Sequence, residues 1–280
     1  MDGKPMVSVV ILTKNEERNI GTCLRHLFSQ NYRNFEVIVI DANSVDNTVK
    51  IAELYGCRVI EEQDGRGFGY ARNLGIKASK GDLILFLDAD VFLLSRDCLE
   101  RAIYRFREHK ADVLLARLRF PNTVLGKYLS MAFPNRLATD WGKYTPHNGF
   151  MLVNKVSLID IGLYDENFVE GAEDVDLLYR MHLAGKKVVY DPEIEVFHAG
   201  GHSVEEWKGK AYRDGYSICK FNFKYGLKSG LIKLPIYPIL ASVYAALRVA
   251  SFKMLYYNFV LAKWRRKGYK DALRDLKLRK

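Results

Sequence analysis

The chain has 280 residues, of which 49% are hydrophobic and 27% charged, a composition of globular rather than disordered proteins. Of its 43 basic and 33 acidic residues, 18 and 5 lie from Gly201 onward, so the whole net charge of +10 comes from the C-terminal part. This asymmetry predicts an anionic surface or polymer as the partner of that part. The four cysteines are widely spaced, which argues against a zinc site or a disulfide framework and predicts reduced cytosolic thiols.

The first part of the chain reads as alternating strands and helices. Val7–Leu12 is an apolar run of six residues, which predicts a strand and not a signal peptide. A polar turn at Thr13–Glu16 follows it, and apolar residues with helical spacing predict a helix over Asn19–Gln30. Phe35–Ile40 predicts a second buried strand, which ends in a carboxylate, Asp41.

The alternation continues after this second strand. Ser44–Thr48 resembles a helix cap, and Cys57–Ile60 predicts a short third strand. Gly65–Gly69 is a glycine-rich loop without the spacing of a P-loop or a dinucleotide fingerprint, which argues against a kinase, a P-loop ATPase or a dehydrogenase. A helix is expected over Tyr70–Ala78. The order predicts an α/β fold with a mostly parallel sheet and right-handed crossovers.

The next strand carries the most informative motif. Leu83–Phe92 begins as an apolar run and ends in Asp88-Ala89-Asp90, at the edge where open α/β sheets bind their ligands. Two interpretations are open at this point. Asp88 and Asp90 are either solvated loop residues or ligands of a hard divalent cation that is shared with a phosphate.

Further elements follow in order, namely a helix at Cys98–Lys110, a strand at Asp112–Leu118, an irregular substrate-facing region at Pro121–Pro146, a strand approached through His147–Val153 and a helix at Lys155–Ile161. Helical spacing after Gly171 places Glu173 and Asp174 at a helix start, where acidic residues are also ordinary partners of the helix dipole. Strands at Lys187–Tyr190 and Glu193–Phe197 precede His198. A lone histidine is more often a surface residue than a ligand, unless it meets Asp90 in space.

With these pieces in place, the chain resembles the family 2 glycosyltransferases of the GT-A fold. The resemblance covers Val7 to His198, about seven-tenths of the chain. It depends on the order and spacing of five motifs that are weak individually: VSVVILTKNEE, VIVIDANSVDNT, YARNLGIKASKGDLILFLDAD, GLYDENFVEGAEDVDLLYR and VFHAGG. It implies a Rossmann-like, mostly parallel sheet flanked by helices and an inverting transfer of a sugar.

The resemblance also implies roles for particular residues. The base and ribose of a nucleoside diphosphate sugar, with UDP or GDP as carrier, would be held by Thr13, Asn15, Glu16, Asp41, Ser44 and Asp46. Arg72 would contact the diphosphate or the donor sugar, and Ala89 and Gly149 would belong to the same site. Asp88 would face the ribose or sugar, and Asp90 would bind Mg²⁺ or Mn²⁺ with Asp88 and His198 as further ligands. Asp174 would be the catalytic base, with Glu173 beside it.

Two departures from the family pattern matter for the donor and the product. Lys14 replaces an aromatic residue in the first loop, which leaves the base contact open. No Gln-X-X-Arg-Trp follows Asp174, so the chain is expected to add a single sugar rather than to act processively. An alternative from another class is a non-catalytic GT-A module that binds nucleotide or glycan, although the metal and base residues are all in place.

The C-terminal segment predicts a second region, with a catalytic domain over residues 1–225 and a basic, amphipathic helical extension over 226–280. Its longest charge-free run, Leu234–Leu247, has 14 residues, short of the ~20 that span a bilayer. Either the extension caps the catalytic domain, or its helices lie in an anionic membrane interface. The latter predicts a cytoplasmic protein on the inner face of the cell membrane and a glycan or lipid-linked acceptor. Nucleic acid is not an expected partner, because no recognition motif is present.

Overall fold

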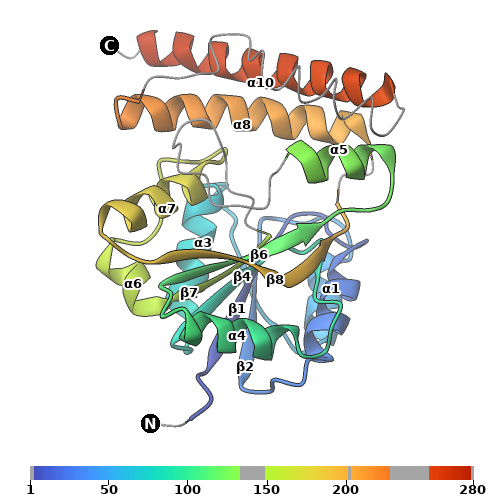
Figure 1. Ribbon diagram of the computed structural model, residues 1–280, viewed down its shortest axis with the longest axis vertical. Helices are drawn as coiled ribbons and strands as arrows, with labels where there is room; N and C mark the ends of the chain where they lie inside the picture. The colour runs from blue at the N-terminus through green and yellow to red at the C-terminus, as the bar shows by residue number, and fades with distance from the viewer. Residues whose placement is uncertain (1–2, 133–148, 201–202, 228–251, 279–280) are drawn as a thin grey trace. The chain divides into compact units, whose positions relative to one another are not determined.

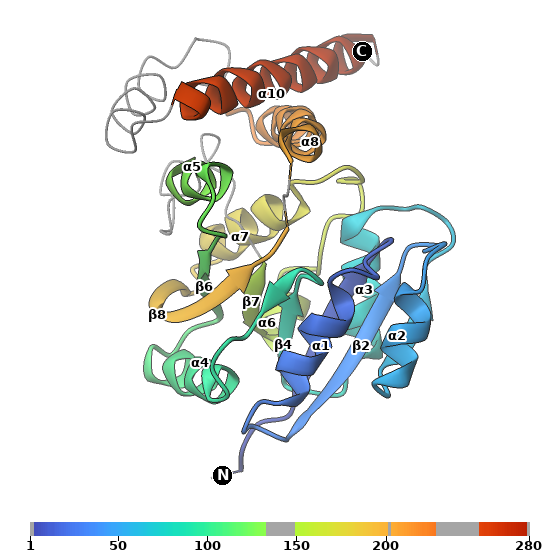
Figure 2. The same ribbon diagram turned by 90° about the vertical axis from the view of Figure 1, so that its right-hand side faces the viewer.

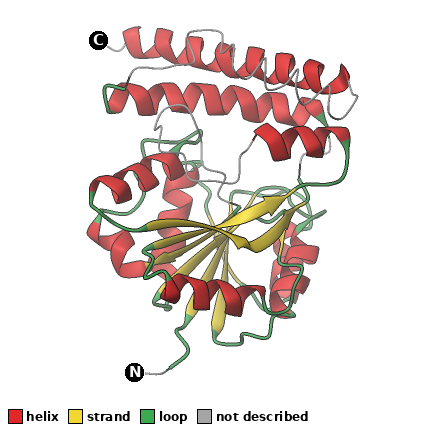
Figure 3. Cartoon of the chain, in the orientation of Figure 1, coloured by secondary structure: helices red, strands yellow, loops and turns green. Residues whose placement is uncertain are grey.

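The computed structural model of the chain describes residues 3–132, 149–200, 203–227 and 252–278 (Figure 1). The chain divides into two compact units, one of Met1–Arg119, Asn148–Val169 and Asp176–Gly200 and one of Phe120–His147, Glu170–Val175 and Gly201–Lys280. Strands occupy the first unit, and long helices characterise the second (Figure 3).

The first unit is built on an eight-stranded sheet with the order β3-β2-β1-β4-β7-β6-β8-β5. The strands are β1 (Val7–Thr13), β2 (Phe35–Asp41), β3 (Arg58–Glu61), β4 (Leu83–Leu87), β5 (Val91–Phe92), β6 (Val113–Arg119), β7 (Phe150–Asn154) and β8 (Val188–His198). The four strands from β3 to β4 pair in parallel, as the alternation of strands and helices predicts.

The central strands are the apolar runs of the sequence. Every residue of β4 is buried, and so are six of the seven residues of β1. Parallel pairing aligns the strand ends, so that Thr13 at the end of β1 stands beside Asp41 at the end of β2. Polar residues that follow these strands are therefore gathered at one edge of the sheet.

Helices cover both faces of this sheet. They are α1 (Ile20–Phe28), α2 (Thr48–Leu54), α3 (Phe68–Ala78), α4 (Cys98–Glu108) and α6 (Lys155–Asp160), together with most of α7 (Glu173–Leu183), whose first three residues belong to the second unit. In Figures 1 and 2, α1 lies on one face and α3 on the other. The buried residues of α1 recur at intervals of three and four, Ile20, Cys23, Leu24 and Leu27, as an amphipathic helix requires.

Two features of the sheet differ from the sequence-based expectation. β7 runs antiparallel between β4 and β6, and β5 runs antiparallel to β8, so the sheet is mixed at one side. The two strands expected at Lys187–Tyr190 and Glu193–Phe197 are one strand, β8. Its pairing with β6 is irregular, because Asp191 and Glu195 lie opposite the successive residues Ala116 and Arg117. This irregularity accommodates Pro192, which has no N–H for a regular ladder.

The second unit contains α5 (Val124–Ala132), α8 (Val204–Lys224) and α10 (Phe252–Leu278). The expectation of irregular structure over Pro121–Pro146 is wrong for α5, and residues 133–148 of that region lie outside the described residues. The buried pair Leu125 and Leu129, spaced by four, is the helical signal that the sequence offered there.

α8 and α10 pack side by side and run in the same direction. The Tyr212 hydroxyl donates to Asp271 at 3.1 Å, and four residues further along both helices the Tyr216 hydroxyl donates to Asp275 at 2.7 Å. The two backbones approach closely at Gly215 and Gly268. A Cβ on Gly215 would lie 1.8 Å from the backbone oxygen of Arg265, and a Cβ on Gly268 would lie 2.0 Å from the backbone oxygen of Tyr212. Glycine at both positions thus permits the close crossing.

Candidate active site

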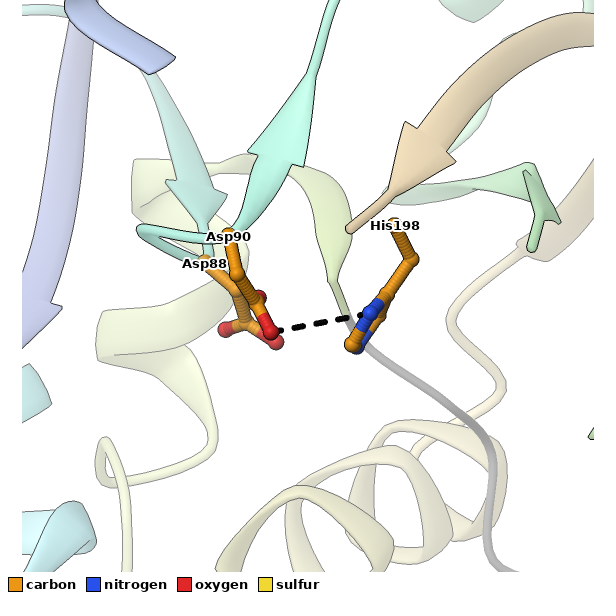
Figure 4. Close-up of side chains that lie close together, drawn as sticks. All are labelled: Asp88, Asp90 and His198. Atoms are coloured by element: carbon orange, nitrogen blue, oxygen red, sulfur yellow. Dashed lines mark ion pairs between the residues drawn. The ribbon is translucent and has the colours of Figure 1, made fainter. Parts of the chain in front are cut away.

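The three side chains predicted as metal ligands meet at the end of the sheet. Asp88 and Asp90 follow β4, and His198 is the last residue of β8. β5 pairs with β8 so that Val91 stands opposite His198, which brings the neighbouring Asp90 to the histidine. His198 Nδ1 lies 3.6 Å from Asp90 Oδ2, and one ligand atom of each of the three residues lies within 4.8 Å of the others (Figure 4).

Backbone hydrogen bonds hold the turn that carries the two carboxylates. The Asp88 N–H donates to the backbone oxygen of Gly149 at 3.1 Å, and the Ala199 N–H donates to the backbone oxygen of Asp90 at 2.8 Å. A Cβ on Gly149 would lie 3.6 Å from Asp88 Oδ2, so this residue borders the carboxylate. Ala89 between the two aspartates is buried, whereas the Asp90 side chain is 21% exposed. The turn therefore buries its middle residue and leaves Asp90 accessible.

The donor set of this cluster fits a divalent cation. Carboxylate oxygens are the ligands of Mg²⁺ and Mn²⁺, and a buried imidazole beside them adds a nitrogen ligand that favours a transition metal. His198 is 3% exposed and faces Asp90, so it is not the surface histidine of the alternative interpretation. Two carboxylates that converge on one point repel each other unless a cation neutralises them.

Glu16 and Cys23, from the loop and helix after β1, lie near enough to Asp88 and Asp90 to be influenced by their charge. Burial raises the pKa of Glu16, a hydrogen bond from Asn19 opposes this rise, and the negative charges of Asp90 and Asp88 add to it. Burial also raises the pKa of the Cys23 thiol, and the same two aspartates contribute. The Cys23 sulfur lies 3.8 Å from the Asp88 backbone oxygen, beneath the turn. The negative charge of Asp88 and Asp90 thus contributes to the raised pKa of both Glu16 and Cys23. A bound cation would offset that contribution.

A second cluster forms where β1 and β2 end. The carboxylate of Asp41 accepts hydrogen bonds from the Thr13 hydroxyl at 2.7 Å, from the Ser44 N–H at 2.8 Å and from the Ser44 hydroxyl at 2.6 Å. Asp41 is 1% exposed and Thr13 is 4% exposed. Asp41 therefore shapes the loop after β2, and both of its oxygens are engaged by protein groups.

The loops after β1 and β2 brace each other by reciprocal hydrogen bonds. The Asn15 N–H donates to the Ser44 hydroxyl at 2.8 Å, and the Val45 N–H donates to the Asn15 side-chain oxygen at 2.9 Å. The Glu17 N–H donates to Asp46 Oδ2 at 3.2 Å. Asn15 has a φ of 57°, a left-handed conformation that asparagine tolerates better than most residues. The two loops form a fixed rim at the sheet edge.

Arg72 on α3 supplies a buried cation. It is 8% exposed, and its guanidinium carbon lies 5.4 Å from the ring centre of Tyr164 and 6.0 Å from that of Phe86, two residues before Asp88. The neighbouring Asn73 fixes this arrangement, because its side-chain N–H donates to the backbone oxygen of Tyr164 and its side-chain oxygen accepts from the backbone N–H of Tyr164, each at 3.0 Å. The two aromatic rings thus fix the position of a guanidinium, a group suited to binding a phosphate or carboxylate.

Glu173 and Asp174 begin α7, as the helical spacing predicts, and both belong to the second unit. Glu173 is 4% exposed, and Asp174 is partly exposed. One carboxylate oxygen of Asp174 accepts from the Val175 N–H at 2.7 Å, the local bonding expected of an acidic residue at a helix start.

Gly200 adjoins the Asp88, Asp90 and His198 cluster and was not predicted from the sequence. A Cβ on Gly200 would lie 1.8 Å from Asp90 Oδ2, and its N–H donates to His198 Nδ1 at 3.2 Å. The residue therefore lies directly against both ligands, and any side chain there would displace the Asp90 carboxylate. The only sequence signal was its place two residues after His198, in the VFHAGG motif.

Replacing Gly200 with alanine is expected to weaken Mn²⁺ binding by about tenfold or more, the loss typical of disturbed supporting groups around a metal. Gly21→Ala is the matched control, because a Cβ there would lie 3.5 Å from Ile51, an ordinary contact. Electron paramagnetic resonance of free Mn²⁺ measures both affinities. If Gly200→Ala binds Mn²⁺ as tightly as Gly21→Ala does, the ion is not held by Asp90 in this arrangement.

Residues 8–162, 155 of the 280 residues, match the family model for glycosyl transferase family 2. A poly-beta-1,6-N-acetyl-D-glucosamine synthase from Staphylococcus aureus is 27% identical over 203 residues, which cover 66% of this chain and 48% of that protein. The chain thus spans about half the length of the curated relatives it matches.

Solved structures share the fold at lower identity. The mannosyltransferase PcManGT from Pyrobaculum calidifontis, in complex with GDP-Man and Mn²⁺, is similar with a TM-score of 0.64 at 18% identity, over 93% of this chain and 74% of that chain. Staphylococcus aureus TarS 1-349, in complex with UDP-GlcNAc, is similar with a TM-score of 0.55 at 19% identity, over 96% and 92%. These likenesses confirm the predicted fold class. The family match covers more than half of the chain and includes Asp41, Asp88 and Asp90, so the protein belongs to glycosyl transferase family 2.

Proposed function

We propose that this protein transfers a single sugar from a nucleoside diphosphate sugar to an acceptor hydroxyl or phosphate, with a divalent cation and with inversion at the anomeric carbon. The observation that carries the proposal is the convergence of Asp88, Asp90 and His198 at the ligand-binding edge of the sheet. An oxygen-rich cation site at that edge is suited to a diphosphate.

Asp88, Asp90 and His198 would hold Mn²⁺ or Mg²⁺. The bound ion would neutralise the charge that develops on the leaving nucleoside diphosphate. Mn²⁺ is the better candidate of the two, because an imidazole ligand suits it more than it suits Mg²⁺. The complex of PcManGT with GDP-Man and Mn²⁺ supports the pairing of a nucleotide sugar with this ion in a protein of similar fold.

The base and ribose would lie against the braced rim formed by the loops after β1 and β2. Thr13, Asp41 and Ser44 bond one another, so their contribution is to fix the backbone that meets the nucleoside. A rim that is already ordered loses little entropy when a ligand binds. The carrier would be UDP or GDP, since the similar structures were solved with UDP-GlcNAc and GDP-Man.

Arg72 would bind the diphosphate or the donor sugar. Its guanidinium lies close to the rings of Tyr164 and Phe86, and Asn73 binds the Tyr164 backbone, so the guanidinium would need little reordering on binding. Asp88 would face the ribose or the sugar, beside Gly149. A pre-positioned cation next to a metal-bound diphosphate stabilises the charge of the transition state.

Asp174 would take the proton from the acceptor hydroxyl as it attacks, with Glu173 beside it. Asp174 is the more suitable base, because it is partly exposed whereas Glu173 is buried. A single in-line displacement needs one such base on the face of the sugar opposite the leaving group, and it inverts the anomeric carbon. The acceptor would be a glycan or a sugar-carrying lipid.

A thermal unfolding screen against nucleotide sugars tests the proposal. A donor present at about 100 times its Kd stabilises the native state by about 2.7 kcal/mol, so the melting temperature should rise for one donor and only when Mn²⁺ is present. Release of the nucleoside diphosphate is then measured with that donor and acceptor glycans. A shift without release would favour the non-catalytic module, and the lack of a shift with any UDP or GDP sugar would contradict the proposal.

A further inference from the structure

One face of α10 exposes a continuous row of aromatic and basic side chains. The row recurs at intervals of three or four residues, so its members lie along one side of the helix. All are exposed, with Tyr256 at 55%, Phe259 at 71% and the Arg274 side chain at 76%. We call this the α10 stripe; its members are Tyr256, Phe259, Lys263, Arg266, Lys270, Arg274 and Lys277.

The acidic residues of α10 lie off this stripe. The helix contains two, Asp271 and Asp275, and these accept hydrogen bonds from Tyr212 and Tyr216 of α8. Arg274 lies 3.4 Å from Asp271, one turn back along the helix, but its side chain remains mostly exposed. The buried residues Leu261 and Ala272 lie on the opposite side of the helix. The stripe is therefore a basic surface, with its aromatic residues gathered at one end.

The order of side chains along the stripe indicates its partner. Basic residues alone would suit any polyanion, but Phe259 has no polar group, and water is a poor environment for so exposed a ring. At a membrane surface, aromatic side chains enter the boundary between headgroups and acyl chains, and cations meet anionic headgroups. We propose that the α10 stripe binds the surface of an anionic lipid membrane, with the Tyr256 end inserted and the Lys277 end on the headgroups.

The binding proposed here is to the membrane surface. No helix in the part of the chain that the structure describes has both the length and the low charge that crossing a bilayer requires. The stripe would instead hold the protein at the membrane face, where a lipid-linked acceptor would lie. The proposal does not rest on the transfer reaction, because binding to vesicles is measured without donor or acceptor.

Flotation of the full chain with two kinds of vesicle tests the proposal, one of phosphatidylcholine alone and one that also contains phosphatidylglycerol. The chain should float with the anionic vesicles, much less with the neutral ones, and less again as salt is raised. Equal flotation with both kinds, or none with either, would overturn the proposal. So would salt-dependent binding to duplex DNA without binding to anionic vesicles, which would mark the stripe as a nucleic-acid surface.

Two variants connect the binding to the stripe. Each cation near an anionic surface contributes roughly fivefold to partitioning, so Lys263→Gln with Arg266→Gln and Lys270→Gln should lower the partition coefficient about 100-fold. The control removes the same charge from exposed lysines of the first unit, with Lys77→Gln, Lys80→Gln and Lys187→Gln, and should leave binding nearly unchanged. Equal losses in the two triple variants would overturn the assignment.

The aromatic end is tested separately, since charge variants do not probe insertion. Phe259→Gln should reduce the binding that remains at high salt, while the salt-sensitive part persists. Melting temperatures of all variants should stay near that of the wild type, because every substituted side chain is exposed. Wild-type binding by Phe259→Gln at high salt would contradict the insertion of the aromatic end.

Discussion

Replacing Asp90 with asparagine should abolish the Mn²⁺-dependent binding of a nucleotide sugar and lower transfer by at least about 100-fold. The substitution keeps the shape of the side chain but removes the charge that a divalent cation requires, and metal-assisted stabilisation of a leaving group is worth several kcal/mol. His198 Nδ1 lies 3.6 Å from Asp90 Oδ2, so the substitution weakens a proposed metal ligand directly beside the histidine. Melting temperatures with the best donor, with and without Mn²⁺, measure the first effect, and release of nucleoside diphosphate measures the second.

The control for this experiment lies at the other end of β4. Asp82 is exposed and precedes β4, whereas Asp90 follows it, so Asp82→Asn makes the same chemical change at the other end of the strand. It should behave as the wild type in both measurements. The metal assignment would be wrong if Asp90→Asn kept a Mn²⁺-dependent shift, or if transfer by the wild type continued unchanged in a chelator.

Replacing Asp174 with asparagine should leave donor and Mn²⁺ binding intact and lower kcat by about 1,000-fold, within the range that general base catalysis contributes. An amide cannot accept the proton of the attacking hydroxyl, whereas the groups proposed to hold the donor are unchanged. The effect should therefore fall on kcat and not on the donor-induced shift in melting temperature. Turnover with saturating donor and acceptor, beside a donor titration, separates the two quantities.

Two further substitutions identify which carboxylate acts. Glu173→Gln tests the neighbouring acid, which is buried and is expected to support the helix start more than the chemistry. Glu170→Gln is the control, since Glu170 pairs with Lys220 at 2.9 Å and its side chain is 40% exposed. Near-normal turnover of Asp174→Asn together with a large loss in Glu173→Gln would transfer the role of base to Glu173.

The sequence predicted the parallel half of the sheet because its central strands are mostly apolar runs. β1, β2 and β4 were recognisable in this way, and each is followed by polar residues that parallel pairing must gather at one edge. The positions of Asp41, Asp88 and Asp90 followed from that rule. Helix boundaries such as the start of α7 followed from the spacing of apolar residues.

Other features depend on pairing between distant segments, which spacing along the chain does not encode. His198 reaches Asp90 because β5 adds to β8 at the far side of the sheet, and β8 stays whole because an irregular register accommodates Pro192. The contact of Gly200 with Asp90 likewise depends on tertiary packing. The glycine crossing of α8 and α10 was not predictable, because Gly215 and Gly268 have no apolar side chain to mark a buried face.

The loop residues show a related limit. Thr13, Asp41 and Ser44 were expected to hold the nucleoside directly, and the sequence could not show that they bond one another. Polar side chains at a sheet edge can serve a ligand or the loop that meets it, and only their partners in space distinguish these uses. Their contribution to donor binding therefore stays a prediction, now through the shape of the rim.

Anomalous diffraction from a crystal grown with Mn²⁺ and UDP or GDP would show whether Asp88, Asp90 and His198 hold the ion beside a nucleotide. One strong manganese peak is expected between the carboxylates of Asp88 and Asp90 and the His198 ring, with the diphosphate beside it. A nucleotide bound at the sheet edge with no manganese there, or with the ion held by other residues, would contradict this assignment.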